Sequence, residues 1–219
     1  VSASDSDSDS DSVSDSVSDS VWNPGPGCRW GRGRAYRRMP QGPKLRAEAL
    51  STPFHVVLVE PEIPPNTGAV ARTCAATSSP LHLVGELGFR IDAQAVRRAG
   101  LDYWPLVDLH RHENFDQFLA RFDASAPGPR LHLFTTKARQ SHVQTRFEPG
   151  DALVFGRESV GLSEALLRRF PDRWVGIPTL GGVRSLNLSN AVSVAIFEAL
   201  RQVGALDRTY VQHLDEPPA

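Results

Sequence analysis

Residues 177–202, IPTLGGVRSLNLSNAVSVAIFEALRQ, join the end of an apolar run to a helix. The run stops at Pro178, and the helical pattern extends from Val192 to Leu200 with apolar residues on nearly every face. A turn and a helix cap need only one or two polar side chains. This junction instead carries five of them, on Arg184, Ser185, Asn187, Ser189 and Asn190. The excess predicts a binding loop, and an extended N-cap with surface polar residues is the structural alternative.

Two earlier segments show the same order of strand, loop and helix. The segment LVFGRESVGL, residues 153–162, begins with an apolar run that stops at Gly156. Ser163 can then cap a helix through Leu167. Residues 56–59 form another apolar run, which is followed by the proline-rich segment PEIPP. The prolines stop the strand, and Asn66 or Thr67 can cap the helix that follows.

Strand and helix patterns alternate along the chain, which predicts an α/β domain with a mostly parallel sheet and helices on both faces. Residues 113–122 place four apolar side chains at helical spacing, so Phe115, Phe118 and Phe122 are expected in the core. Asp92 can cap a short helix that Gly100 closes. The expected strands are residues 54–59, 81–84, 104–109, 131–135, 152–155 and 174–177.

Ligands of such sheets bind outside the carboxyl ends of the strands. Three segments fall there, residues 135–137, 156–158 and 178–185, and their convergence predicts a site. The chain has neither a G-x-G-x-x-G nor a G-x-x-x-x-G-K-[ST] motif, so neither a Rossmann dinucleotide site nor a P-loop is supported. Ser159 lies in a G-x-x-S-x-G pattern, which is one residue too long for a hydrolase nucleophile elbow.

The segments PEIPPNTGAVARTCAAT, LVFGRESVGL and IPTLGGVRSLNLSNAVSVAIFEALRQ resemble the three motifs of the SPOUT class of RNA 2'-O-methyltransferases. The stretch RRAGLDYW at residues 97–104 is similar to the TrmL-like branch, the tRNA (cytidine/uridine-2'-O)-methyltransferases that modify the wobble nucleotide. The resemblance covers residues 54–202. Ala69 stands where the family often has Asn, and Ser78 where it often has Gly.

The resemblance implies a homodimer with a C-terminal trefoil knot that uses S-adenosylmethionine to methylate the ribose 2'-hydroxyl of a tRNA wobble nucleotide, with tRNA-Leu as the expected substrate. It places Arg72 at the reacting ribose or its phosphate, and the catalytic residues are expected to be Arg72, Ser185 and Asn187. An ion pair of Arg72 with Glu158 is the alternative for that arginine. The residues expected to bind the cofactor are Phe134, Thr135, Gly156, Glu158, Ile177, Ser185 and Asn190.

Other functions stay open at this point. They are 2'-O-methylation of another tRNA site or of ribosomal RNA, and a noncatalytic RNA-binding module of the same fold. The five polar side chains Arg72, Glu158, Ser185, Asn187 and Asn190 argue together against a lost active site.

Charge is balanced overall, with 24 Lys and Arg against 25 Asp and Glu, but it is unevenly distributed. Residues 1–20 are a Ser-Asp repeat with six Asp and no basic residue, and residues 21–46 contain seven basic residues and no acidic one. Neither stretch has the periodicity of a packed element, so a disordered leader is expected over residues 1–50. The methyltransferase domain is then expected over 51–205 and a tail over 206–219. Met39 is a possible native start.

Cysteines and histidines indicate no metal site. Cys28 lies in the leader, and Cys74 is expected to be a small core residue. The seven His lack ligand-like spacing, and His110 with His112 is the only close pair. No window reaches the roughly 20 apolar residues of a membrane span, and no apolar signal-peptide region is present, so a cytoplasmic protein is expected.

Overall fold

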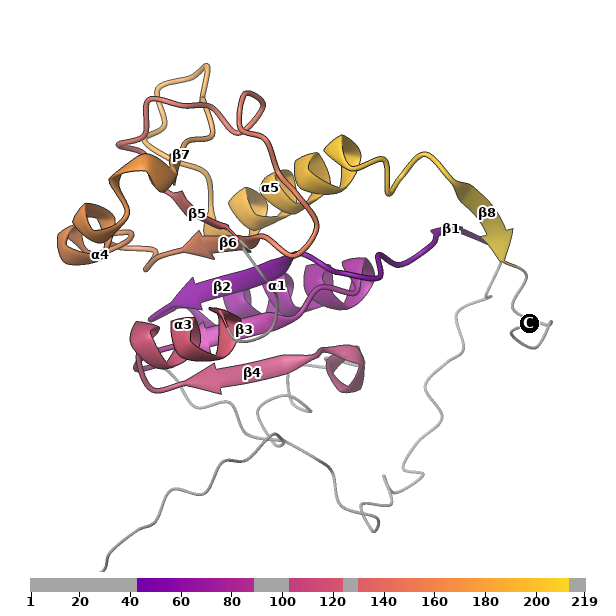
Figure 1. The fold of residues 1–219 in the computed structure, drawn as a ribbon, viewed down its shortest axis with the longest axis horizontal. Helices are drawn as coiled ribbons and strands as arrows, with labels where there is room; N and C mark the ends of the chain where they lie inside the picture. Colours follow the sequence, from indigo (N-terminus) through magenta and orange to yellow (C-terminus); the bar gives the residue numbers. More distant parts are fainter. Residues whose placement is uncertain (1–42, 89–102, 124–129, 213–219) are drawn as a thin grey trace, which may run out of the picture. The chain divides into compact units, whose positions relative to one another are not determined.

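The computed structural model describes residues 43–88, 103–123 and 130–212 of the 219. Six strands form one sheet in the order β4-β3-β2-β6-β5-β7 (Figure 1). All five pairings are parallel, which confirms the expected sheet. The strands are β2 (His55–Val59), β3 (Leu81–Val84), β4 (Leu109–His112), β5 (Leu131–Phe134), β6 (Ala152–Phe155) and β7 (Trp174–Val175).

Helices cover both faces of this sheet, as expected (Figure 1). Helix α5 (Leu188–Gln202) contacts α1 (Pro64–Thr77) and β6, whereas α3 (Phe115–Asp123) contacts β3 and β4. Because side chains alternate along a strand, Val56 and Leu58 join the cluster under α1 and α5, and Val57 joins the cluster with α3 and α4 (Glu164–Arg169). Both faces of the central strands are therefore buried, which explains their continuous apolar sequence.

The structure corrects one expected helix start and confirms another. Helix α1 begins after Ile63 with prolines in its first turn and no side-chain cap, so Asn66 and Thr67 are not caps but buried residues of that turn. Ser163 does cap α4, since its Oγ accepts a hydrogen bond from the Leu166 amide at 3.3 Å. Ser78 ends α1 with φ 52°, a left-handed conformation that favours glycine.

The strand expected over residues 104–109 is wrong in position. Trp104–Leu106 form a 3-10 turn, η1, because Pro105 fixes its own φ and the Leu106 amide donates to the Tyr103 carbonyl. The strand begins only at Leu109 and runs through His112. Its sequence, LHRH, contains no apolar run, so a pattern of apolar residues does not reveal it. A second 3-10 turn, η2 (Pro171–Arg173), precedes β7.

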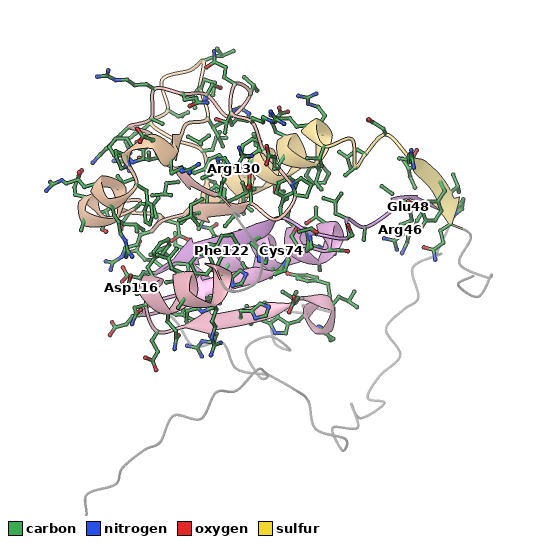
Figure 2. The ribbon with its side chains drawn as sticks, in the orientation of Figure 1. Arg46, Glu48, Cys74, Asp116, Phe122 and Arg130 are labelled. Carbon is green, nitrogen blue, oxygen red and sulfur yellow. The ribbon has the colours of Figure 1, made fainter. Side chains whose placement is uncertain are left out.

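Two of the three expected core aromatics are confirmed as buried, and the third, Phe115, is partly buried against the same cluster. Phe118 and Phe122 on α3 are buried, and Cys74 on α1 is a buried free cysteine (Figure 2). Burial raises the pKa of the Cys74 thiol to about 12, so it stays protonated. Cys28, Met39, the helix expected between Asp92 and Gly100, and most of RRAGLDYW lie outside the described residues.

A two-stranded antiparallel ribbon lies beyond the expected domain boundaries. Strand β1 (Lys44–Ala47) falls inside the expected leader, and β8 (Thr209–Gln212) falls inside the expected tail. The two pair with each other, with Leu45 opposite Val211. The expectation of a disordered leader is therefore wrong for residues 44–47. Their partner strand, β8, lies at the other end of the domain, so the sequence around residues 44–47 contains no pattern that reveals the pairing.

A row of histidines crosses the α3 face of strands β2, β3 and β4. His55 Nδ1 lies 2.9 Å from His82 Nε2, and His82 Nδ1 lies 3.0 Å from His112 Nε2. His110 stacks on the His82 ring with the ring centroids 4.8 Å apart. The aromatic rings of α3 cover the row, with Phe118 edge-on to His82 and His112. The sequence indicated only the His110 and His112 pair, because the other two partners come from neighbouring strands.

Burial favours the neutral forms of His55, His82 and His112, because it lowers the pKa of each. It lowers the pKa of His82 to about 2, with His55 and His110 adding electrostatic repulsion, and it lowers the pKa of His112 to about 4, with Arg121 adding to the effect. Below pH 6.5 the unfolded chain therefore binds protons that the folded chain does not. Folding stability must fall as the pH falls from 6.5 toward 4, by at most about 1.4 kcal/mol per pH unit for each such group.

Replacing His112 with Phe tests this coupling, because Phe fits an aromatic site and does not titrate. Within the described residues His112 Nδ1 is buried without a hydrogen-bond partner, so the polar contact that Phe removes is the one between His112 Nε2 and His82 Nδ1. We expect the free energy of unfolding in urea to fall less steeply below pH 6.5 in His112→Phe, by up to about 1.4 kcal/mol per pH unit. Equal slopes in the two proteins would contradict the neutral row.

Candidate functional site

A cavity of about 690 Å³ opens at the carboxyl ends of β5, β6 and β7. This is the sheet edge where the sequence predicts a site, and the volume is in the range of roughly 300–1,000 Å³ that suits small ligands. One wall is aromatic, because Phe134 and Phe155 stack with their ring centroids 4.6 Å apart. The cavity-lining residues that the sequence also predicted as cofactor-binding or catalytic residues are Phe134, Thr135, Gly156, Glu158, Ile177, Ser185 and Asn187.

Glu158 fixes the loop after β6 to the start of α1. Its Oε2 accepts a hydrogen bond from the Glu62 amide at 2.9 Å, and its Oε1 accepts from the Ile63 amide at 3.3 Å and from Asn66 Nδ2 at 3.0 Å. Helix α1 has no side-chain cap of its own, so this carboxylate satisfies backbone donors at its beginning. A negative charge at a helix N-terminus is also favourable to the helix dipole.

Asn66 continues this network to the third segment. Its Oδ1 accepts a hydrogen bond from Asn187 Nδ2 at 2.9 Å, while Asn187 Oδ1 caps α5 by accepting from the Ser189 amide at 2.9 Å. Asn66 therefore joins the β6 loop and the α5 loop. We call the chain of side chains Glu158, Asn66 and Asn187 the amide bridge.

Sequence reasoning missed the role of Asn66, which it treated as a possible cap. A signal was present, because an Asn between buried helix positions must find partners for both ends of its carboxamide. The identity of those partners was not accessible, since Glu158 and Asn187 lie 92 and 121 positions further along the chain.

Two further contacts hold the β6 loop against the loop after β2. Arg157 forms an ion pair with Glu60, a residue with a left-handed φ of 52°. Ser159 donates from its amide at 3.1 Å and from its hydroxyl at 2.9 Å to Glu62, and these bonds lower the pKa of that carboxyl. The cavity rim is thus built by contacts between segments rather than within them.

Gly156 is required by the loop itself. A Cβ at this position would lie 2.2 Å from the Gly161 carbonyl carbon and from the Leu162 amide nitrogen, so any side chain collides with backbone. The need for a small residue thus comes from the close return of the loop onto its own start, before any ligand is considered.

Arg72 and Asn190 are not among the residues that line the cavity. Arg72 is exposed on α1 and places its guanidinium 5.1 Å from the centre of the Tyr103 ring. The alternative ion pair with Glu158 is not found among the described contacts, and that carboxylate is occupied by α1 instead. Asn190 is exposed on the first turn of α5.

Ser185 lies in the cavity lining and its residue is exposed. Its hydroxyl makes no hydrogen bond within the part of the chain that the structure describes. It contrasts with Asn187, whose carboxamide is used at both ends by Asn66 and Ser189. Ser185 can therefore bind a ligand directly, whereas Asn187 positions the loop.

Residues 53–197 match the model of the SpoU rRNA Methylase family, which is about two thirds of the chain. The chain belongs to this family. The residues that line the cavity, the amide bridge, the first two motif segments and residues 177–197 of the third lie within the matched residues, so the site is part of the family domain. The ribbon strands β1 and β8 lie outside them.

Curated relatives share the whole domain. The chain is 52% identical over 153 residues to a tRNA (cytidine(34)-2'-O)-methyltransferase of Burkholderia pseudomallei, a match that covers 69% of this chain and 96% of that protein. It is 46% identical over 150 residues to the enzyme of the same name from Aeromonas hydrophila, covering 68% and 94%.

Solved structures agree with the fold. A structure described as giving insights into the 2-OH methylation of C/U34 on tRNA is 49% identical, with a TM-score of 0.63 over 68% of this chain and 95% of that one. The methyltransferase AviRb of Streptomyces viridochromogenes, in complex with AdoMet, is 26% identical, with a TM-score of 0.59 over 72% and 59% of the two chains.

Two kinds of feature are missing from the described ranges. No group of three or more His, Cys, Asp or Glu side chains within residues 43–88, 103–123 and 130–212 is arranged to hold a metal ion. Within the same ranges no helix has the length and apolar character needed to cross a bilayer.

Replacing Asn66 with Asp tests the amide bridge. The substitution preserves shape and the acceptor for Asn187, but it replaces the donor to Glu158 with a second carboxylate. We expect the protein to lose about 1–3 kcal/mol of stability and the Glu62 and Ile63 amides to exchange faster with solvent. Lower pH should restore part of the loss, because a proton shared by the two carboxyls remakes the bond.

Thr73→Val is the matched control. It removes a hydrogen bond between α1 and α5, the contact of Thr73 with Ser193 at 3.2 Å, without touching the bridge. Amide exchange of Glu62 and Ile63 measured by NMR should match the unmodified protein in this control. Equal exchange in Asn66→Asp and Thr73→Val would show that the bridge does not hold the loop.

Proposed function

We propose that this chain transfers a methyl group from S-adenosylmethionine to the ribose 2'-hydroxyl of the wobble nucleotide, cytidine or uridine 34, of tRNA. The observation that carries the proposal is the cavity formed by three motif segments that the amide bridge joins, in a domain shared with relatives of that activity. Within this class of substrate we propose a leucine tRNA, on the resemblance to the TrmL-like branch. A tRNA substrate is also the basis for proposing a cytoplasmic location.

The cavity residues fit S-adenosylmethionine. Phe134, Ile177 and the backbone at Gly156 offer an apolar cradle to a purine ring, and the free Ser185 hydroxyl offers a hydrogen bond to a polar group. When bound, this cofactor supplies a methyl group made electrophilic by its sulfonium. The chain therefore has to hold the ribose oxygen in line with that carbon and let the hydroxyl proton leave as the new bond forms.

Arg72 is the residue we assign to the RNA side. It lies outside the cavity lining, and the face of the Tyr103 ring limits where its guanidinium can point. Tyr103 is itself anchored, since its hydroxyl donates to the Gly68 carbonyl at 2.7 Å. A guanidinium held in this way can bind a phosphate or ribose oxygen through two parallel hydrogen bonds.

Replacing Arg72 with Ala should leave binding of S-adenosylhomocysteine unchanged in calorimetry and reduce single-turnover methylation of tRNA by about 100-fold, the effect of misplacing a reactant. Arg72→Lys should recover little, because an ammonium lacks the planar pair of donors. Asn187→Ala should impair both binding and turnover, since this residue caps α5 and holds Asn66.

Nucleoside mapping of the methylated tRNA identifies the product. The proposal requires a methyl on the ribose of nucleotide 34. A methyl on a base, methylation of ribosomal RNA alone, or full activity of Arg72→Ala would each contradict a separate part of it. Absence of methyl transfer with intact RNA binding would favour a noncatalytic RNA-binding module.

We also propose that the C-terminal segment forms the trefoil knot of the SPOUT class. The chain order supports this path: β7 pairs with β5 at one edge of the sheet, and α5 then returns to contact β6 and α1. In the segment between them, Ile177 and residues 184–187 line the same cavity as the β6 loop.

A homodimer through α5 is the assembly we propose. Val194 and Phe197 are 38% and 47% exposed on one stripe of α5, where an apolar face without cover favours association. Arg72 and Asn190 are exposed on the adjoining helices α1 and α5. These are the two expected site residues that do not line the cavity of one chain, and a second copy bound at α5 would lie close to both.

Phe197→Glu should place a charge in this interface and shift the protein toward monomers in sedimentation experiments. Val143→Glu is the control, because Val143 is 59% exposed and lies on the loop after β5. A Phe197→Glu protein that keeps the molecular mass of the unmodified protein at every concentration would exclude this face as the dimer contact.

A further inference from the structure

The ribbon of β1 and β8 has both faces exposed. Leu45, Tyr210 and Val211 are 71%, 51% and 54% exposed, so the described residues cover neither side. A two-stranded ribbon is marginally stable in water on its own. It also lies outside residues 53–197, the part that matches the family model. The ribbon is therefore an addition to the methyltransferase domain that needs a partner of its own.

The two faces of the ribbon differ in chemistry. Because side chains alternate along a strand, Lys44 and Arg46 share a face with Gln212 and Tyr210, the residues opposite them in the register. A hydrogen bond from Arg46 Nε to Gln212 Oε1 at 3.2 Å agrees with this placement. This basic face, Lys44, Arg46 and Tyr210, combines two cations with an exposed aromatic ring.

Charge around the ribbon favours an anionic partner. Arg208 directly precedes β8, and the sequence before β1 carries five basic residues and no acidic one over residues 21–43. Within the described residues, the acidic side chains next to the strands are Glu48, which lies beside Arg46 (Figure 2), and Asp207. Asp215 and Glu216 follow β8 in the sequence. Lysine and arginine beside an exposed aromatic ring form the combination that binds phosphates and stacks on bases.

We propose that the basic face of the ribbon binds RNA outside the methyl-transfer cavity, with Lys44 and Arg46 on backbone phosphates and Tyr210 stacked on a base. This inference rests on the proposed tRNA substrate. A second copy of the chain fits less well, because a two-fold contact through this face would bring like charges together. The opposite face offers only Leu45 and Val211 as large apolar side chains, too few for the roughly 1,000 Å² of a stable interface.

The test is equilibrium binding of the full chain to a tRNA transcript as the salt concentration is raised. We expect Lys44→Gln with Arg46→Gln to weaken binding about tenfold at low salt and to reduce the slope of log K against log salt by about two, one for each phosphate contact. Tyr210→Leu should weaken binding several-fold and leave that slope unchanged, because stacking releases no counterions.

Arg146→Gln with Arg168→Gln is the matched control, since it removes the same charge from exposed arginines that are not part of the ribbon strands. This control should keep the slope of the unmodified chain. All variants should bind S-adenosylhomocysteine with unchanged affinity, because none of the substituted residues lines the cavity.

Three outcomes would overturn the ribbon assignment. Unchanged RNA binding in the Lys44 and Arg46 variant, beside full methylation by the unmodified chain, would reject the ribbon alone and leave the proposed function standing. No RNA binding by the unmodified chain would reject both. A change of oligomeric mass in Leu45→Thr with Val211→Thr, together with intact RNA binding in the basic-face variant, would assign the ribbon to a second copy.

Discussion

The hydrogen bonds that Asn66 makes with Glu158 and Asn187 are the constraint on which the site depends. A carboxamide that is largely buried has to satisfy both its donor and its acceptor. Here each end is satisfied by a different loop, so the three motif segments can reach their positions only together. The cavity therefore forms only when all three segments are in place, and no single segment determines its shape.

The start of α1 shows how far this dependence goes. Two prolines begin the helix, and no side chain of its own segment caps it. Glu158, from the loop after β6, accepts instead from the amides of Glu62 and Ile63, the two residues that precede the helix. The helix that presents Arg72 is therefore oriented by the loop that lines the cavity. For a reaction that requires in-line approach of two substrates, such coupling fixes the relative position of the cofactor side and the RNA side.

Sequence patterns predicted what is local. The strands at residues 81–84 and 152–155 and the Ser163 cap were found where they were expected, because apolar runs and caps are properties of neighbouring residues. The role of Asn66, the histidine row around His82 and the pairing of Leu45 with Val211 were not predicted. Each of these joins residues from distant segments, and single-sequence periodicity contains no information on such partners.

A crystal structure of the protein with S-adenosylhomocysteine would test the cavity and the amide bridge together. We expect the ligand in the cavity between Phe134, Gly156 and Ile177, with Asn66 still bonded to Glu158 and Asn187. A ligand bound elsewhere would contradict the assignment of the cavity, and a ligand in the cavity whose binding separates Asn66 from both partners would contradict the role of the amide bridge.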